Sequence, residues 1–544
     1  MGALHDAIRA LQAVPPGAVL GPARFALVAG DGQDVLALQR AVTADLAEFG
    51  ATARPLSALD HETILLELPG RAFMDDDAAA FEVAYALAAA FGLRAAEPDL
   101  PTPFFPDDTT ASDGKDPVQE GVSDLLGCWA PAEPGLAADW ALTTMRVRDA
   151  WAFSDAQQWP SRGEDIIVAQ PDTGVTSHPE LAGVNRAGSF DVLDNDTDPT
   201  DPLNDGGNPG HGTATASVLL SPPAGTVTGT APRARHMPIR AIESVVRVTQ
   251  VSVAEAMDWA VAHGAAVITM SLGGIPSFSL HRALLRAVAA DVIVLAAAGN
   301  CVRTVVWPAR YDDCIAVAGT DANDAPWQGS CRGATVDVSA PGQNVTRARV
   351  VPGGGPGDVA QGQGTSFAVA LTAGVAALWL AHHGRANLVA AARARGETVQ
   401  GMFRRLLRAT ARRPAGWNSF DYGAGVVDAR ALLEASLDLG RDLESQEVTM
   451  APSERSAATV ASLAAEAHPE TALAEMDWDR FGPELAARLL RQQMYPPGAT
   501  LEAVAALPPP SPTLDGVVND PALRRALGLG DVMAGEVLLE WGAP

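Results

Sequence analysis

The sequence predicts an α/β protein in which a mostly parallel sheet is flanked by helices, preceded by a small α+β domain and followed by a helical extension. Three observations predict this. From Trp140 to about Asp438, short apolar runs alternate with helical stretches. From Phe25 to Pro101 the pattern reads strand, helix, strand, strand, helix, strand. Beyond Gly440 the chain is polar and Ala-rich with helical periodicity.

Composition limits the kinds of function to be considered. The chain has 544 residues, of which 47% are hydrophobic and 19% charged. That is enough apolar material for several packed domains, and it argues against a disordered chain. The formal net charge is −27, and so acidic a surface repels phosphate groups. We therefore expect neither a nucleic acid nor a membrane as a partner.

Four segments differ in composition, and we take them as the domains. Residues 1–101 have the β-α-β-β-α-β order of a small ferredoxin-like domain. Residues 102–136 are rich in Pro, Asp, Gly and Ser, which is typical of an exposed linker open to proteolytic processing. Residues 137–440 form the α/β domain, and residues 441–544 form a helical extension in which we find no chemistry.

Apolar runs identify the strands of the α/β domain. The runs IIVAQ, AAVITMSL, DVIVLAAA and CIAVAGT do not alternate with polar residues, as expected of strands buried on both faces of a parallel sheet. The longest largely apolar run, Phe367–Ala381, has 15 residues, fewer than the roughly 18 that suggest a membrane span.

The N-terminal stretch gives no sign of a secretory signal. MGALHDAIRALQAVPP carries Asp6 and Arg9 among its apolar residues, so it lacks an uninterrupted apolar core. We therefore expect a cytoplasmic protein, with export by an unrecognised route left open.

Three short motifs in the α/β domain carry the residue types of a nucleophilic site. IIVAQPDTG ends a strand on Asp172, PGHGTATAS places His211 at a helix start, and GQGTSFAVA places Ser366 at the start of the longest apolar helix. A serine hydroxyl needs a base to take its proton, and an imidazole titrates near working pH. A buried carboxylate then fixes the ring. Strand ends and helix starts of this kind can meet at one edge of a sheet.

Each of these residues taken alone has a simpler explanation. Ser366 together with Thr365 could cap a buried helix, and Asp172 could serve a turn. His211 is one of ten histidines. The order and spacing of the three motifs together favour a catalytic interpretation.

The order Asp, His, Ser and the flanking residues resemble the subtilisin-like serine peptidases over about residues 140–438. The resemblance implies a serine endopeptidase acting on protein or peptide substrates. In it Ser366 is the nucleophile, His211 carries the proton and Asp172 orients His211. Asn300, in VLAAAGN, matches the side-chain donor of the family's oxyanion hole, with the Ser366 backbone N–H as the second donor. The rate should rise with pH around ~6.5–7 as His211 loses its proton.

The same resemblance implies a peptide-binding cleft. SLGG matches the family's substrate-binding edge strand, where a peptide adds as an extra strand. The segment VVWPA places a valine where the best-known subtilisins have glycine, so we predict a shallow pocket and a preference for small apolar residues before the cleaved bond. The residues assigned to substrate binding are Ser271, Leu272, Gly273, Gly274, Ala297, Ala298 and Val306.

The N-terminal domain resembles the family's propeptide, with AEPDL matching the close of that domain. The resemblance implies an intramolecular chaperone and inhibitor, so that the chain is a zymogen and its own N-terminal domain is a partner. A small α+β module unrelated to inhibition is the alternative.

An acidic loop between Phe190 and His211 is a candidate calcium site. Carboxylates at this density suit Ca²⁺, and similar loops in the family hold calcium, while acidic turns exposed to solvent are the alternative. No cofactor is required for the chemistry, and calcium would have a structural role. The ligands we name are Asp194, Asp196, Asp198 and Asp201.

Cysteine usage is sparse. The four cysteines include no Cys-x-x-Cys pair, and we expect buried free thiols. A disulfide from Cys301 to Cys314 or Cys331 stays open.

Two other functions are consistent with the sequence. One is a catalytically silent module that binds peptides on the same fold. The other is a processing peptidase dedicated to one partner, with the C-terminal helices as its docking site.

Overall fold

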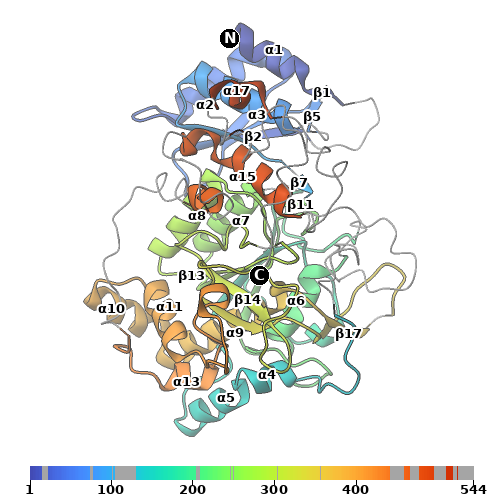
Figure 1. Ribbon diagram of the computed structural model, residues 1–544, viewed down its shortest axis with the longest axis vertical. Helices are drawn as coiled ribbons and strands as arrows, with labels where there is room; N and C mark the ends of the chain where they lie inside the picture. Colours follow the sequence, from blue (N-terminus) through green and yellow to red (C-terminus); the bar gives the residue numbers. More distant parts are fainter. Residues whose placement is uncertain are drawn as a thin grey trace.

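The computed structural model describes residues 1–14, 22–73, 77–100, 102–103, 130–203, 209–245, 247–248, 250–302, 304–355, 357–440, 459–465, 477–494, 510–518 and 524. Most of the expected linker, with its processing site, lies outside the described residues. Figure 1 shows a small N-terminal domain above a larger α/β domain, with C-terminal helices packed beside the small domain.

The α/β domain is built on a seven-stranded sheet in the order β15-β14-β13-β12-β8-β10-β9. All neighbouring strands pair in parallel, as the apolar runs predicted. The strands are β8 (Ile167–Asp172), β9 (Phe190–Asp191), β10 (Arg235–Arg240), β12 (Val267–Met270), β13 (Ile293–Ala297), β14 (Ile315–Thr320) and β15 (Val338–Pro341).

Alternate residues of the central strands β12, β13 and β14 enter two cores, one on each face of the sheet. Ile268 of β12 lies in one core, together with residues of α7 and α8. Its neighbour Val267 lies in the other, together with residues of α6, α9, α11 and α13. The first face is covered by α7 (Gln250–Ala262) and α8 (Phe278–Ala289). The helices of the second core are α5 (Val147–Ala156), α6 (His211–Leu220), α9 (Thr365–His383), α11 (Val399–Thr410) and α13 (Ala429–Glu434), with α4 (Trp140–Thr144) and α10 (Arg385–Arg395) nearby.

The described part of this domain has a few smaller elements. An antiparallel pair of strands precedes α9 in the chain, and a short 3₁₀ helix follows β8. These elements are β16 (Val345–Ala348), β17 (Val359–Gly362), η3 (Pro179–Leu181) and α12 (Ser419–Tyr422).

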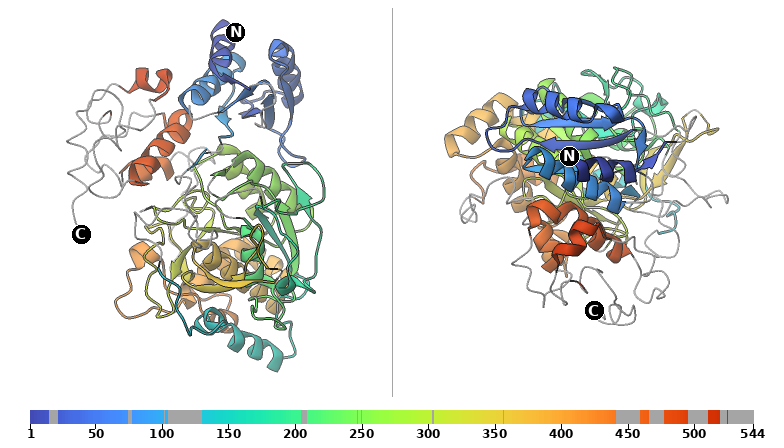
Figure 2. Two further views of the ribbon diagram at one scale, coloured as in Figure 1. Left: turned by 90° about the vertical axis from the view of Figure 1, so that its right-hand side faces the viewer. Right: turned by 90° about the horizontal axis from the view of Figure 1, so that it is seen from above.

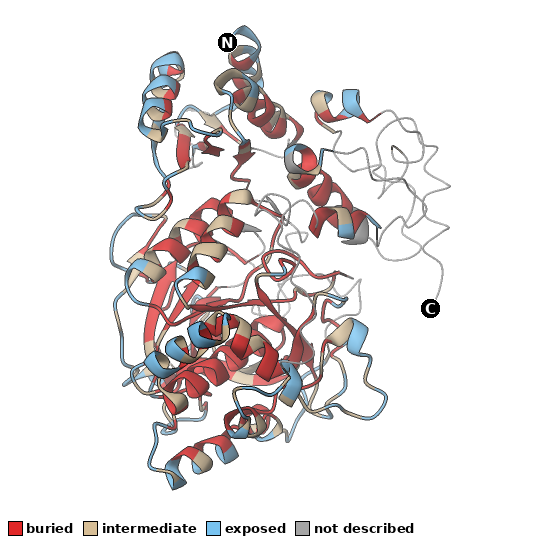
Figure 3. Cartoon of the chain, turned by 90° about the vertical axis from the view of Figure 1, so that its left-hand side faces the viewer, coloured by how far each residue is buried: buried red, intermediate tan, exposed pale blue. Residues whose placement is uncertain are grey.

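Helix α9 is the centre of the second core. Among the described residues it is the one helix long and apolar enough to cross a membrane, and the whole of its apolar window is buried inside the protein. Figure 3 shows how thoroughly the helices and strands of the α/β domain are buried. Such burial on every side explains why α9 is hydrophobic around its whole circumference.

The four-stranded sheet of the N-terminal domain and the helices α2 and α3 follow the predicted β-α-β-β-α-β order, and α1, β1, η1 and β5 are additional elements that the sequence did not predict. Its antiparallel sheet runs β3-β4-β2-β6. Phe25 and Leu27 of β2 pack into the domain's own core, whereas Ala26 between them joins the core shared with α7 and α8. One face of this sheet therefore lies against the α/β domain. The elements are α1 (Gly2–Ala10), β1 (Gln12–Ala13), β2 (Ala23–Val28), α2 (Val35–Asp45), η1 (Ala47–Phe49), β3 (Thr52–Pro55), β4 (Thr63–Leu68), β5 (Arg71–Ala72), α3 (Asp77–Phe91) and β6 (Ala95–Pro98).

The described C-terminal residues are helical. They comprise a short helix over residues 459–465, α15 (Trp478–Met494) and α17 (Pro512–Val517). The two views of Figure 2 place α15 and α17 beside the N-terminal domain, away from the centre of the seven-stranded sheet.

Candidate active site

The predicted catalytic residues gather at the carboxyl edge of the parallel sheet. Asp172 is the last residue of β8, and Asn300 follows β13. His211 and Ser366 are the first and second residues of α6 and α9. Because parallel strands end at one edge and the following helices begin there, residues far apart in sequence are brought together.

His211 and Asp172 form a buried pair. The distance from His211 Nδ1 to Asp172 Oδ1 is 2.8 Å, and each side chain is only 1% exposed. The carboxylate also accepts the Thr173 backbone N–H at 2.7 Å and the Thr215 hydroxyl at 3.2 Å. Since a carboxylate accepts, Nδ1 of the ring carries the proton. In the neutral ring, Nε2 is therefore the basic nitrogen.

Ser366 lies in the first turn of α9 and is 2% exposed. Its hydroxyl donates to the Ser271 carbonyl at 3.4 Å, and its own carbonyl accepts the Ser271 hydroxyl at 3.0 Å. Helix α9 packs against α6, the helix that begins with His211. The positive end of α9 favours negative charge developing beside Ser366.

Asn300 is oriented by the residue before the serine. Its Oδ1 accepts both the backbone N–H and the hydroxyl of Thr365, each at 2.9 Å. The Thr365 hydroxyl in turn accepts the Gly299 N–H at 3.1 Å. Because a backbone N–H can only donate, the bonded atom of Asn300 is its oxygen, which leaves the amide NH₂ as the donor end. Sequence reasoning missed this use of Thr365, although its place in the GTS motif offered the signal.

The residues assigned to substrate binding also meet at this edge. Gly274 exchanges backbone hydrogen bonds with Trp307, and the Val306 N–H donates to the Ala298 carbonyl at 3.0 Å. Ser271 lies beside Ser366, as described above. Ala297, Ala298 and Leu272 are buried, and Leu272 belongs to the apolar core.

The side chain of Val306 fills the space between two glycine backbones. A Cβ added at Gly273 would lie 2.4 Å from Val306 Cγ2, and one added at Gly299 would lie 2.8 Å from it. Both glycines are therefore needed for the isopropyl group to fit. The valine closes the gap between the segment after β12 and the segment after β13.

Behind Asp172 lies a buried polar network that the sequence did not reveal. Gln170 Nε2 donates to the Gly212 carbonyl at 2.9 Å and to the Thr215 hydroxyl at 2.7 Å. Its Oε1 therefore accepts from His236 Nε2, at 2.9 Å. Burial lowers the pKa of His236 to about 3. His236 is accordingly a neutral ring that helps to fix Thr215, a donor to the Asp172 carboxylate.

The acidic loop between Phe190 and His211 contains an ion pair and several local hydrogen bonds. Among the described residues, no three His, Cys, Asp or Glu side chains are arranged to hold a metal ion. Asp194 and Asp191 both pair with Arg240, at 2.7 and 2.6 Å. A cation from β10 thus pairs with two acids of the loop, and calcium binding by Asp194, Asp196, Asp198 and Asp201 stays a prediction.

The other acids of the loop accept local hydrogen bonds. Asp196 accepts the Asp198 N–H at 2.8 Å, and Asp198 accepts the Thr200 hydroxyl at 2.6 Å. Asp201 is buried, which raises the pKa of its carboxyl, and it accepts the Thr173 hydroxyl at 2.7 Å. These bonds fix the turns of the loop.

The cysteines divide into two kinds. Cys314 and Cys331 are buried free thiols, as expected, and burial raises the pKa of Cys314 above the range in which thiols ionise near neutrality. Cys301 is disulfide-bonded, which contradicts the expectation of a free thiol there. The pairings of Cys301 with Cys314 or Cys331 are excluded, and the one other cysteine, Cys128, lies outside the described residues.

Comparison with known proteins identifies the family. Residues 163–425 match the model of the subtilase family. The chain is 36% identical to thermitase of Thermoactinomyces vulgaris over 253 residues, which are 45% of this chain and 86% of thermitase. It is 36% identical to subtilisin BL of Lederbergia lenta over 220 residues, which are 40% of this chain and 76% of that protein. An alkaline protease of Alkalihalobacillus alcalophilus is 34% identical, and the match covers 46% of this chain and 64% of the alkaline protease.

Solved structures of proteases also align with the chain. The MycP3 protease from the type VII (ESX-3) secretion system aligns with a TM-score of 0.44 and 25% identity over 56% of this chain and 91% of that one. The protease domain of PatA aligns with a TM-score of 0.42 and 28% identity over 53% of this chain and 99% of that one. The sequence matches, above all that to thermitase, establish the assignment: this chain belongs to the subtilase family and is a subtilisin-like serine endopeptidase.

Proposed function

We propose that this subtilase is an autoinhibited zymogen whose catalytic residues are Asp172, His211 and Ser366, with Asn300 as the side-chain donor of the oxyanion hole. The observation that carries the assignment is the fully buried contact of 2.8 Å between His211 Nδ1 and Asp172 Oδ1. The orientation of Asn300 by Thr365 at the same edge of the sheet supports it.

The proposed reaction uses these groups in sequence. Ser366 Oγ attacks the carbonyl carbon of the substrate while His211 Nε2 takes the hydroxyl proton. The carbonyl oxygen becomes negative, and the Asn300 amide and the Ser366 backbone N–H donate to it. The C–N bond then breaks as His211 returns the proton to the leaving amine. Water repeats the cycle on the acyl-enzyme, and because these groups complete the chemistry, the proposal includes no cofactor.

Covalent labelling tests the nucleophile. We expect a fluorophosphonate to label the mature protein once per chain and to leave Ser366→Ala unlabelled. Ser277→Ala is the matched control, because Ser277 caps the start of α8 by accepting the Leu280 N–H. Labelling of Ser366→Ala, or equal loss of labelling in both variants, would contradict the assignment.

The zymogen proposal rests first on two carboxylates of the N-terminal domain. Glu97 is 3% exposed and accepts the backbone N–H groups of Phe278 and Ser279, each at 2.8 Å, at the start of α8. Asp99 accepts the Val251 N–H at 3.0 Å at the start of α7. Both acids therefore satisfy helix N-termini of the catalytic domain. They belong to the AEPDL segment whose resemblance to the propeptide suggested this role.

The chain that leaves the N-terminal domain supports the same proposal. Thr102–Pro103 (β7) pairs antiparallel with Arg247–Val248 (β11) of the catalytic domain. A peptide added as a strand is the mode in which a peptidase cleft holds its substrate. We propose that this tail continues into the cleft and blocks it until the linker is cut.

Self-processing can be followed by mass. Purified full-length protein, incubated and measured intact over time, should separate into two fragments with a cut between Pro106 and Ala138, whereas Ser366→Ala should stay whole. A cut in the Ser366→Ala protein would assign processing to another peptidase.

We further propose that the enzyme prefers small apolar side chains immediately before the cleaved bond. The position of the Val306 isopropyl group between Gly273 and Gly299 supports this preference, because branched carbon there leaves little room for an aromatic ring.

A further inference from the structure

The C-terminal extension contacts the N-terminal domain through buried polar groups. The Tyr85 hydroxyl of α3 donates to Glu484 of α15 at 2.8 Å, and both residues are 5% exposed or less. Glu484 also accepts the N–H and hydroxyl of Ser511 at 2.7 and 2.8 Å. Glu82 of α3 accepts the N–H and hydroxyl of Thr513 at 3.0 and 2.8 Å.

Apolar packing accompanies these bonds. The rings of Tyr85 and Phe481 meet edge to face with centroids 5.1 Å apart. Leu514 of α17 is fully buried and belongs to the same core as Phe81 and Tyr85. The extension thus covers the face of α3 that would otherwise be exposed apolar surface.

The same extension also contacts the catalytic domain. Thr459 Oγ accepts the indole N–H of Trp307 at 3.0 Å, and its carbonyl accepts Arg310 Nε at 3.2 Å. Arg310 is 1% exposed, and its guanidinium also donates to Thr304 Oγ1 at 2.7 Å within the catalytic domain. Val460 and Leu463 are buried in the core that Trp307 shares. One segment of chain is therefore attached to both domains.

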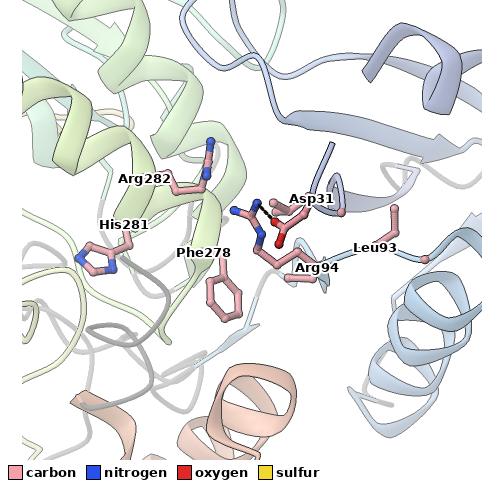
Figure 4. Close-up of a pocket in the computed structure, with 10 residues that line it drawn as sticks. Asp31, Leu93, Arg94, Phe278, His281 and Arg282 are labelled. Carbon is pink, nitrogen blue, oxygen red and sulfur yellow. Dashed lines mark hydrogen bonds and ion pairs between the residues drawn. The ribbon is translucent and has the colours of Figure 1, made fainter. Parts of the chain in front are cut away.

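The direct interface between the two domains contains buried contacts, such as those of Glu97 and Asp99 and the pair Asp60–Arg286 at 3.0 Å, and more exposed ones. It includes charged pairs such as Arg54–Glu255 at 2.8 Å and Glu62–Arg282 at 2.7 Å, and such partly exposed pairs contribute little and are screened by salt. A cavity of about 480 Å³ lies in this interface. Asp31 and Arg94 line it on one side, and Phe278 and Arg282 line it on the other (Figure 4).

We propose that the C-terminal extension is a clamp that holds the N-terminal domain on the catalytic domain after the linker has been cut. The proposal rests on the zymogen function above and adds a second step to activation, since the clamp must be displaced or removed before the inhibitor leaves. The partner of the extension is then the N-terminal domain of the same chain, because that domain packs against the apolar residues of α15 and α17.

Retention of the cut domain tests the clamp. The full chain carrying Ser366→Ala receives a recognition sequence for a foreign, sequence-specific protease within residues 108–126. After cutting, size-exclusion chromatography and mass spectrometry follow how fast the N-terminal fragment leaves. Leu514→Asp should speed release at least ~10-fold, because it removes a fully buried leucine. Val517→Asp is the matched control on the same helix, since Val517 is 47% exposed.

A second pair of variants tests the clamp if the Leu514→Asp protein does not fold. Tyr85→Phe keeps the ring and removes only the hydroxyl that bonds Glu484, so release should speed up about 3- to 10-fold. Tyr422→Phe is its control, because Tyr422 lies on the catalytic domain. Equal release rates in each pair would overturn the clamp. A wrong catalytic assignment would appear in the labelling experiment and leave these rates unchanged.

Discussion

The depth of the proposed specificity pocket should depend on Val306. Its isopropyl group lies between Gly273 and Gly299, at distances that an added Cβ on either glycine could not tolerate. Val306→Gly removes these three carbons and should open room for an aromatic ring. Relief of overpacking is worth about 1–3 kcal/mol, and burial of a phenyl group a further 1.5–3 kcal/mol. Taking about 3 kcal/mol in total, kcat/KM for phenylalanine should rise roughly 150-fold relative to alanine.

The assay compares two peptides that differ only in alanine or phenylalanine before the cleaved bond. Active-site titration with the fluorophosphonate corrects for any loss of folded enzyme. Val306→Ala serves as the graded control and should give an intermediate ratio. The reasoning would be refuted if the wild-type enzyme already preferred phenylalanine, or if the phenylalanine-to-alanine ratio did not change in Val306→Gly.

Three other predictions follow from the described contacts. Thr365→Val removes one of the two hydrogen bonds that orient Asn300, so kcat should fall about 3- to 10-fold with KM unchanged. Thr365→Ser keeps the hydroxyl and should restore kcat. A change confined to KM would argue against this positioning role. His236 is buried with its pKa lowered to about 3, so the unfolded chain takes up a proton below pH 6.5 that the folded one does not, and stability present above pH 6.5 is lost toward pH 3. Between neutral pH and pH 5 this histidine should account for a loss of about 2 kcal/mol. In denaturant unfolding of the Ser366→Ala protein, the added His236→Asn change should reduce the loss by that amount, whereas identical pH slopes would refute the explanation. Part of the slope should remain, because burial also lowers the pKa of His382 to about 4. Finally, Cys314 and Cys331 lie outside any disulfide and Cys301 is disulfide-bonded. Alkylation of the denatured, unreduced protein should therefore add two groups, and alkylation after reduction should add four. Addition of four groups without reduction would contradict the disulfide.

The sequence alone determined the strands, the central helix and the catalytic candidates. Buried parallel strands must be apolar on both faces, so each one is recognisable in the sequence as an uninterrupted run of apolar residues. The catalytic groups lie at strand ends and helix starts, and the motifs around Asp172, His211 and Ser366 mark those positions directly. The order of elements in the N-terminal domain was visible for the same reason, since local periodicity reports local burial.

Only the tertiary structure decided which partners meet across the chain. Arg240 comes from β10 to pair with Asp191 and Asp194 of the acidic loop, a contact that counting the charges within the loop could not reveal. Thr365 orients Asn300 and Glu484 reaches Tyr85 across 399 positions, and no local pattern encodes such pairings. The periodicity of apolar residues in the sequence indicates which side chains are buried. Which side chain each of them contacts is decided only when folding brings distant segments together.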